Sequence, residues 1–358
     1  MGGFSRRAAI GLPAGLAGGL LALELGFRLL EGPLGVDRER LARFRGFVRT
    51  DGEQGQYEPR PHSLYVRSPE DPQVNSLGFL DEEFRREKTP GTLRIACLGS
   101  STTEGGNAAQ REGSYPYFLG RILGERSGRP VETLNFGMSG WTSAETLVNY
   151  VLVVQDFDPD LVLIHEAVND VEPRAWPRFA ADYSHYRRPW RDVPISPAYR
   201  ALITTSDLFA VWQLRSEQVF GIAAAVNRPP EGPYRFTDGR LPPETAAPFK
   251  RNVRTIAEHV RLRGGHPALV TMPYDSARTE ALPLFRAGLD EHNAILRELA
   301  QEERLLLVDL DALARQQPER WRREFLDLVH LTPQGNRLKA EAIADALLAA
   351  WPRGVPGR

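Results

Sequence analysis

The chain has 358 residues, of which 42% are hydrophobic and 25% are charged, and this composition excludes wholesale disorder. Its 45 lysines and arginines and 46 acidic residues give a formal net charge of −1, which excludes the strongly basic surface of a nucleic-acid-binding protein. Cys97 is the only cysteine, so the chain can form neither an intrachain disulfide nor a multi-cysteine metal site.

An uncharged apolar segment lies near the N-terminus. Residues 8–23 carry no charged side chain, arginines precede them, and apolar positions continue to Leu30. Because roughly 20 apolar residues span a bilayer, residues 1–30 predict a signal anchor with a transmembrane helix, which would place the rest of the chain outside the cytoplasm. Near the end of this segment, Glu24 and Arg28 lie four residues apart and can pair on one helical face or reach the interface.

Two other interpretations of residues 1–30 stay open. A cleaved signal peptide would release a secreted protein, but no small-x-small cleavage site follows the apolar run. A buried or interfacial helix is the third interpretation.

A polar connector follows the apolar segment. Residues 31–90 are charged, rich in proline and glycine, and poor in long apolar runs. They predict a juxtamembrane connector, which either packs on a later domain or forms a partly ordered linker.

Over residues 91–352 short apolar runs alternate with segments of helical spacing. The runs that are typical of buried strands are residues 93–98, 131–136, 161–164, 268–272 and 305–309. The segments with helical spacing are residues 115–126, 144–155, 246–263, 284–301 and 334–350. Continuous apolar strands that alternate with helices predict an α/β domain with a parallel sheet covered on both faces.

Residues 172–243 interrupt this alternation between the third and fourth predicted strands. They are rich in aromatic residues and proline, and residues 202–225 predict one or two helices. We interpret the segment as an insertion over the carboxyl edge of the sheet, where α/β folds bind ligands. It therefore forms either a lid or substrate wall, or an aromatic mini-core that only stabilises a long excursion.

A serine-rich turn follows the first predicted strand. In the segment from Gly99 to Gly105 (GSSTTEG), small residues allow a tight strand-to-helix turn that holds a side chain at the edge of the sheet. Ser101 on such a turn can be a nucleophile, with its own N–H group pointing at the substrate oxygen. A phosphate-binding turn and an ordinary turn are the alternatives, although the spacing matches neither a P-loop nor a dinucleotide fingerprint.

Asp327 and His330 lie close together near the C-terminus. Two intervening residues let the carboxylate reach imidazole Nδ1, which leaves Nε2 free to take a serine proton. Thr332-Pro333 predicts the N-cap and first residue of a helix, so His330 lies just before that helix. A solvated loop histidine is the alternative interpretation.

Two further segments offer hydrogen-bond donors. Residues 135–140 (NFGMSG) follow the second predicted strand and expose backbone N–H groups, and Asn169 follows the third strand with a side-chain amide. An oxyanion hole needs such pre-aimed donors, although glycine and asparagine also end many strands as ordinary turn formers. All four segments lie after a strand or before the last helix, which favours one shared site.

The order of these segments resembles that of the SGNH hydrolases, the GDSL-like esterase and lipase superfamily, over residues 93–350. Ser101 stands where the family has its block I serine, Gly140 matches the block II glycine, and Asn169 matches the block III asparagine. Asp327 and His330 match block V. The sequence departs from the family pattern at two positions, where Ser100 replaces aspartate and Ala167 replaces glycine.

This resemblance implies a three-layer α/β/α fold like that of flavodoxin, with five parallel strands and with no metal or organic cofactor. It implies that Ser101, His330 and Asp327 form a catalytic triad. It also implies that the N–H groups of Ser101 and Gly140 and the Asn169 amide form the oxyanion hole. The expected reaction is hydrolysis of an ester, such as an O-acetylated glycan or a lipid ester, through an acyl-enzyme.

Two other functions stay open. An O-acyltransferase that acts on a cell-envelope glycan would use the same triad, with a sugar hydroxyl in place of water. A catalytically silent glycan-binding scaffold at the membrane is the other, although such a module has no need of all five site residues. His165-Glu166 lacks the second histidine of a zinc motif, so packing against a neighbouring strand is the favoured interpretation. The oligomeric state and the exact ester do not follow from the sequence.

Overall fold

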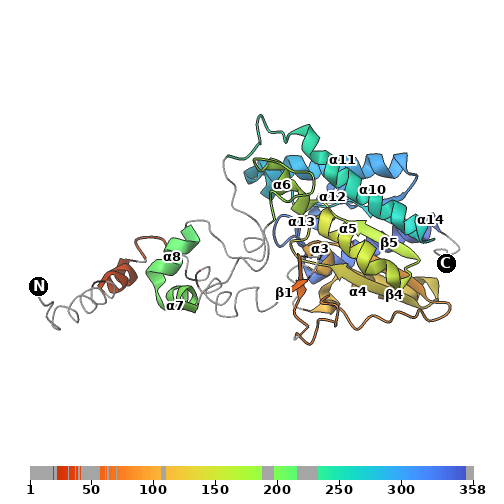
Figure 1. The fold of residues 1–358 in the computed structure, drawn as a ribbon, viewed down its shortest axis with the longest axis horizontal. Coiled ribbons are helices and arrows are strands. Elements are labelled where there is room, and N and C mark those ends of the chain that lie inside the picture. Colours follow the sequence, from red (N-terminus) through yellow and green to blue (C-terminus); the bar gives the residue numbers. More distant parts are fainter. Residues whose placement is uncertain are drawn as a thin grey trace, which may run out of the picture. The chain divides into compact units, whose positions relative to one another are not determined.

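The computed structural model describes residues 71–105, 110–187, 197–215 and 233–351, together with shorter pieces between residues 19 and 69. The chain forms two compact units (Figure 1). The smaller unit combines Met1–Gln56 with Trp190–Val226, and the larger combines Tyr57–Pro189 with Asn227–Arg358. The larger unit therefore begins earlier than residue 91, and only the middle of the predicted insertion, residues 172–243, belongs to the other unit.

A five-stranded parallel sheet forms the centre of the larger unit, as the sequence predicts. Its strands, in chain order, are β3 (Leu93–Gly99), β4 (Val131–Gly137), β5 (Leu161–His165), β6 (His266–Val270) and β7 (Leu306–Val308). The spatial order is β4-β3-β5-β6-β7, which is the flavodoxin-like order. The strand order reverses between β3 and β5, so the carboxyl ends of these two strands flank the place where such folds bind ligands.

Helices cover both faces of this sheet, as expected for a three-layer fold (Figure 1). On one face α4 (Tyr115–Ser127) packs against α14 (Pro333–Ala350). On the other face α5 (Ser143–Leu152), α10 (Ala247–Leu262) and α11 (Pro283–Glu302) pack side by side. Every residue of β3 is buried, because both faces of the strand meet a helix layer. Cys97 lies in this core, as the sequence predicts.

Short elements connect or extend these layers. Two strands, β1 (Tyr57–Arg60) and β2 (Leu64–Arg67), form an antiparallel hairpin that belongs to the larger unit. The short α-helices of the same unit are α3 (Ser101–Glu104), α6 (Val171–Ala175), α12 (Leu310–Gln316) and α13 (Pro318–Arg322). Its 3₁₀ segments are η2 (Arg111–Gly113), η3 (Val154–Phe157), η4 (Val168–Asp170), η6 (Pro243–Ala246) and η7 (Arg278–Ala281).

Helix ends follow the caps that the sequence carries. Thr332 accepts a hydrogen bond from the Gly335 N–H group at 3.0 Å, and a proline opens α14, as predicted. Thr142 and Glu145 form a reciprocal capping box at the start of α5. These caps fix where two helices begin at the carboxyl edge of the sheet, and therefore where the preceding loops turn.

The smaller unit joins the N-terminal segment to the insertion. A helix over residues 22–30 contacts α7 (Pro197–Thr205) and α8 (Asp207–Arg215). Glu24 caps α8, because its carboxylate accepts hydrogen bonds from the Ser206 hydroxyl at 2.7 Å and from the Asp207 N–H group at 2.6 Å. Arg28 pairs with Glu24 at 2.9 Å, which confirms the predicted pairing on one helical face.

Among the described residues no helix has the length and apolar character that crossing a membrane requires. Residues 8–18, 20 and 21, which make up most of the predicted span, lie outside the described part of the chain.

Candidate active site

The turn after β3 places Ser101 at the carboxyl edge of the sheet. The strand ends at Gly99, and α3 begins two residues later with Ser101 itself. A side chain cannot replace the hydrogen of Gly99, because a Cβ atom there would lie 2.6 Å from the His165 carbonyl oxygen and 2.1 Å from Thr103 Oγ1. The glycine thus lets the turn pass close to the neighbouring strand β5.

Ser101, His330 and Asp327 form a continuous row of hydrogen bonds. The Ser101 hydroxyl donates to His330 Nε2, with 2.7 Å between Oγ and Nε2. His330 Nδ1 donates to Asp327 Oδ2, also at 2.7 Å. The structure therefore brings together the three side chains that the sequence predicts as a triad, although 229 positions separate the serine from the histidine.

The loop before α14 orients the acid of this row. Asp327 Oδ1 accepts the backbone N–H groups of Val329 at 3.0 Å and of His330 at 2.9 Å, so the second carboxylate oxygen faces the imidazole. Partial burial raises the pKa of Asp327, but the hydrogen bond and charge of His330 and the two N–H groups outweigh it and lower the pKa to about 2. The carboxylate is therefore ionised at neutral pH and can stabilise an imidazolium.

The two other predicted oxyanion donors lie on neighbouring loops. Gly140 follows β4 in a left-handed conformation with φ +77°, which suits glycine. Asn169 lies in η4 and donates one N–H of its amide to the Trp141 carbonyl oxygen at 2.8 Å, which leaves the second N–H for another acceptor. This hydrogen bond to Trp141, the residue after Gly140, links the Gly140 loop to the Asn169 loop.

A close backbone contact ties the Gly140 loop to the serine helix. The Met138 N–H group donates to the Gly99 carbonyl oxygen at 3.1 Å. A Cβ atom at Gly137 would lie 2.1 Å from the Glu104 nitrogen, so only glycine permits this approach. All the predicted site residues are therefore on connected segments at the carboxyl edge of β3, β4 and β5.

The structure adds polar residues that the sequence does not reveal. Tyr65, Glu104 and Arg187 each form a hydrogen bond to Ser139 or Gly140. Tyr65 and Arg67 lie in the four-residue strand β2, whose sequence and burial do not alternate between apolar and polar positions. Their partners are far away in sequence, so nothing local indicates their role.

His165, Glu166 and Asp170 do not join the row. His165 is buried, and its Nδ1 lies 3.2 Å from the Val270 carbonyl oxygen of the neighbouring strand, which confirms the packing interpretation. Glu166 is buried with one oxygen accepting from Thr146 at 2.6 Å. Asp170 accepts from the Ser143 hydroxyl at 2.6 Å and organises the start of α5. Within the described part of the chain, no group of three or more such side chains can hold a metal ion.

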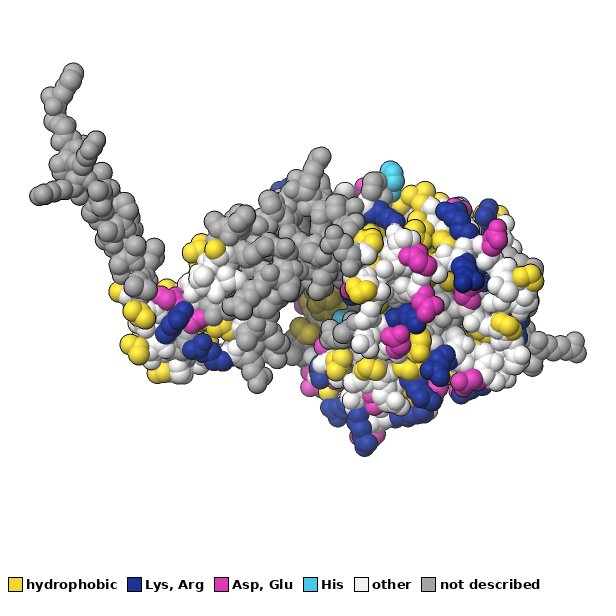
Figure 2. Space-filling view, turned by 90° about the horizontal axis from the view of Figure 1, so that it is seen from below, with side chains coloured by type: hydrophobic (Ala, Val, Ile, Leu, Met, Phe, Trp, Pro, Cys, Tyr) yellow, Lys and Arg dark blue, Asp and Glu magenta, His cyan; other side chains and the backbone are white. Residues whose placement is uncertain are grey.

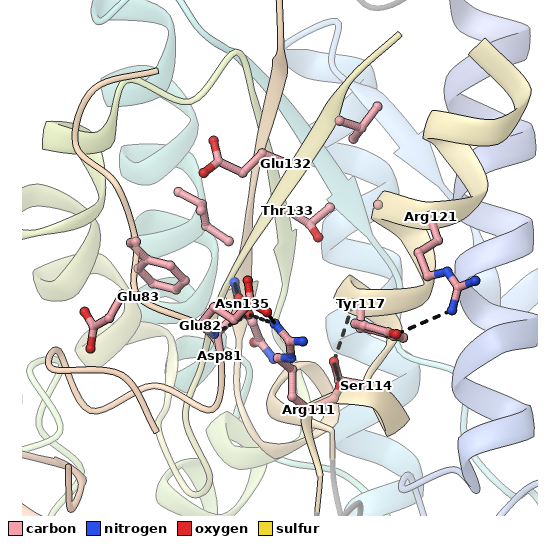
Figure 3. Close-up of a pocket in the computed structure, with 14 residues that line it drawn as sticks. Asp81, Glu82, Glu83, Arg111, Ser114, Tyr117, Arg121, Glu132, Thr133 and Asn135 are labelled. Atoms are coloured by element: carbon pink, nitrogen blue, oxygen red, sulfur yellow. Dashed lines mark hydrogen bonds and ion pairs between the residues drawn. The ribbon is translucent and has the colours of Figure 1, made fainter. Parts of the chain in front are cut away.

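A separate pocket of about 280 Å³ lies along the edge strand β4 (Figure 3). Arg111 lies beside Asp81 and Glu82 in this view and pairs with Glu82 at 2.6 Å. Asp81 in the same pocket accepts the Asn135 N–H group at 2.9 Å. It thereby gives a hydrogen-bond partner to one backbone N–H on the edge of the sheet. None of the five predicted site residues lines this pocket, so it is distinct from the Ser101 row.

Several solved structures are similar to this chain at low sequence identity. No curated protein sequence matches the chain. The fold is similar to that of the acetyl xylan esterase AlAXEase, with 18% identity, a TM-score of 0.44, and coverage of 71% of this chain and 99% of that one. It is also similar to Axe2, an acetylxylan esterase from Geobacillus stearothermophilus, with 17% identity, a TM-score of 0.44, and coverage of 71% and 93%. LAE5, an alpha/beta hydrolase enzyme from the metagenome of Lake Arreo, Spain, is 17% identical with a TM-score of 0.45. The match covers 75% of this chain and 98% of that one.

The family itself follows from the sequence. A sequence model of the GDSL-like lipase/acylhydrolase family matches residues 97–338, which is more than half of the chain. This match spans both Ser101 and the Asp327–His330 pair, and it confirms the resemblance seen in the sequence. The chain therefore belongs to the GDSL-like lipase/acylhydrolase family of ester hydrolases.

Proposed function

We propose that the protein is a membrane-anchored, extracytoplasmic serine esterase that hydrolyses O-acyl, O-acetyl or lipid esters through an acyl-enzyme. The observation that carries this proposal is the hydrogen-bonded row from Ser101 Oγ through His330 to Asp327, with 2.7 Å at each step. A serine, a histidine and a carboxylate in this order supply a nucleophile, a base and a group that stabilises the base's charge.

In the proposed acylation step, Ser101 Oγ attacks the ester carbonyl carbon while His330 Nε2 takes the hydroxyl proton. Asp327 holds Nδ1–H and stabilises the imidazolium that results. The N–H groups of Ser101 and Gly140 and the free N–H of Asn169 donate to the oxyanion that develops on the carbonyl oxygen. Collapse of the tetrahedral intermediate breaks the ester C–O bond, and His330 gives its proton to the leaving alcohol.

Deacylation repeats the sequence with water. His330 takes a proton from a water molecule, which attacks the acyl carbon of the Ser101 ester. The same donors hold the second oxyanion. Breaking the bond to Ser101 releases the carboxylic acid, and the serine recovers its proton from the imidazolium. Each residue thus returns to its starting state without a cofactor entering these steps.

Turnover of p-nitrophenyl acetate by the full chain in detergent tests the esterase proposal. We expect the wild type to release p-nitrophenolate and Ser101→Ala to be slower by several orders of magnitude. Ser127→Ala provides a hydroxyl-deletion control at the end of α4, where the hydroxyl donates to the Leu123 carbonyl oxygen, and it is expected to keep wild-type activity. Equal, slow turnover by the wild type and Ser101→Ala would contradict the proposal.

Two features support the proposed membrane location. Residues 8–23 carry no charged side chain. The smaller unit also exposes large apolar side chains on helix 22–30 and on α8, where Leu29 is 83%, Leu23 62% and Trp212 58% exposed. Apolar side chains lie on the described surface of this unit in Figure 2. An exposed apolar surface, together with an uncharged apolar run in the sequence, is typical of attachment to a bilayer.

Membrane attachment and orientation need separate experiments. We expect the full chain to stay in the membrane pellet after an alkaline wash, whereas full release of the intact chain would contradict an anchor. We also expect an alkaline phosphatase reporter fused after Gln56 to be active, because this reporter matures only after export. An inactive but stably expressed fusion would contradict the extracytoplasmic location.

A further inference from the structure

One peptide group of the candidate oxyanion hole accepts a hydrogen bond on its carbonyl oxygen, the end opposite its N–H. The peptide bond joins the Ser139 carbonyl carbon to the Gly140 nitrogen. The Ser139 carbonyl oxygen and the Gly140 N–H therefore belong to one planar peptide group. Tyr65, which is fully buried on β2, donates its hydroxyl hydrogen to that Ser139 oxygen at 2.6 Å. The hydroxyl therefore acts on the far end of the group whose N–H is the proposed donor.

A second contact fixes the same residue from the side. The Ser139 hydroxyl donates to Glu104 Oε2, and Arg67 Nε donates to Glu104 Oε1 at 2.5 Å. Glu104 is buried at the end of α3, the helix that begins with Ser101. Arg67 balances the buried charge of this carboxylate. Glu104 thus links the serine helix to the Gly140 loop, and the hairpin supplies both of the outer contacts.

The carbonyl oxygens that follow are held as well. Arg187 donates to the Gly140 oxygen at 2.8 Å and pairs with Glu145 at 2.9 Å. Asn169 donates to the Trp141 oxygen at 2.8 Å. Three consecutive carbonyl groups are therefore bound by side chains, and the left-handed Gly140 between them has little freedom to rotate its N–H away.

A donor on a peptide oxygen has two effects on the N–H of the same group. It polarises the group, which strengthens the hydrogen bond that the N–H donates by about 10–30%. It also fixes the direction of the N–H, and electrostatic stabilisation of an oxyanion depends on donors that need no reorganisation during the reaction. Both effects act on the transition state more than on the bound ester.

We propose that Tyr65 is a positioning residue for catalysis, which fixes the direction of the Gly140 N–H through the Ser139 carbonyl. Arg67 and Glu104 assist by holding the Ser139 hydroxyl. The β1–β2 hairpin is then part of the catalytic apparatus although it lies outside residues 97–338. This inference rests on the proposed esterase function. It extends that function by giving the segment before the family match a role in the rate of the reaction.

The test compares Tyr65→Phe with Tyr274→Phe in the full chain. Tyr274 is a suitable control because its hydroxyl is also hydrogen-bonded, to Asp290 at 2.7 Å, but not to the Gly140 loop. Removing a whole oxyanion donor costs about 10²–10³ in kcat, and Tyr65 acts through such a donor, so we expect Tyr65→Phe to lower kcat by about 10-fold with KM changed less than about 2-fold. Tyr274→Phe is expected to keep wild-type kcat.

Inhibition by phenylboronic acid provides a second measurement. This acid forms a reversible tetrahedral adduct with an active serine, and the adduct places an oxygen in the oxyanion hole. We expect its inhibition constant to rise in Tyr65→Phe by about the same factor as kcat falls, because both quantities report binding of the tetrahedral species. Ser139→Ala, which removes only the side contact, is expected to give a smaller change in both quantities.

The outcomes separate this inference from the proposed function. If the wild type turns over the ester and Ser101→Ala does not, but Tyr65→Phe matches Tyr274→Phe in kcat and in inhibition, the positioning role is wrong and the esterase proposal stands. If Tyr65→Phe lowers only the melting temperature, the residue is structural and the inference is likewise overturned. If neither the wild type nor Ser101→Ala has activity, the proposed function itself is wrong.

Discussion

Replacing Asp327 by asparagine tests how the loop before α14 directs the imidazole. One carboxylate oxygen accepts the N–H groups of Val329 and His330 at 3.0 and 2.9 Å, and the other accepts His330 Nδ1–H at 2.7 Å. An asparagine keeps its amide oxygen toward the two backbone donors, because its NH₂ group would be repelled there. The NH₂ group then faces Nδ1 and turns it into an acceptor.

The consequence for the rate follows from the tautomer. With Nδ1 as an acceptor, the imidazole proton moves to Nε2, which faces Ser101 Oγ at 2.7 Å and can no longer take its proton. The same change in a buried serine protease triad lowers kcat by about 10⁴. Here the Asp327 side chain is 48% exposed, so water can compete for Nδ1. We therefore expect Asp327→Asn to lower kcat by about 10³, or about 4 kcal/mol in activation free energy.

Asp327→Ala separates the tautomer effect from simple loss of the carboxylate. Alanine presents no group to Nδ1, and water can accept Nδ1–H at this half-exposed position, so we expect a kcat about 10-fold above that of Asp327→Asn. The assay is steady-state turnover of p-nitrophenyl acetate, with thermal unfolding to show that both variants are folded. A wild-type kcat for Asp327→Asn, or an alanine variant slower than the asparagine variant, would refute the reasoning.

Three further predictions concern the base, a close backbone contact and a buried acid. His330→Ala is expected to lower kcat by about 10⁴ without unfolding the domain, and normal turnover would exclude it as the base. Gly137→Ala places a Cβ atom 2.1 Å from the Glu104 nitrogen, so we expect the free energy of unfolding to fall by about 1–3 kcal/mol in denaturant titrations. An unchanged unfolding midpoint would contradict this close contact. Burial raises the pKa of Asp170 from 3.8 to about 6, so the folded chain holds a proton there that the unfolded chain releases, and the free energy of unfolding falls as pH rises through that window. Asp170→Asn is expected to make this fall smaller, and an identical pH profile for wild type and variant would show that Asp170 does not titrate in this range.

Much of the larger unit could be predicted from local patterns. The run at 93–98 marks β3 because a strand buried on both faces is continuously apolar, and the observed strand is Leu93–Gly99. Thr332 marks the start of α14 because a cap is a local hydrogen bond. Ser101 lies at the carboxyl edge because it follows β3, and His330 meets it there because it lies just before α14, which begins at the same edge.

The contacts that link distant charged side chains could not be predicted in this way. Arg67 and Glu104 are each typical of solvent-exposed positions, yet they pair at 2.5 Å across 37 positions of the chain. Glu24 reaches the start of α8 across 183 positions. No local periodicity encodes such pairs, because each side chain is buried only through its partner. The hairpin over residues 57–67 has no local signal either, although the sequence left open that the connector packs on a later domain.

The nucleophile is the most direct point at which to test the account. Incubating the full chain with a fluorophosphonate probe, followed by peptide mapping in a mass spectrometer, identifies the side chain that reacts. We expect one adduct, on Ser101, that forms much more slowly in His330→Ala and is lost in Ser101→Ala. An adduct on another residue, or labelling of Ser101→Ala at the wild-type rate, would contradict the assignment of Ser101 as the nucleophile.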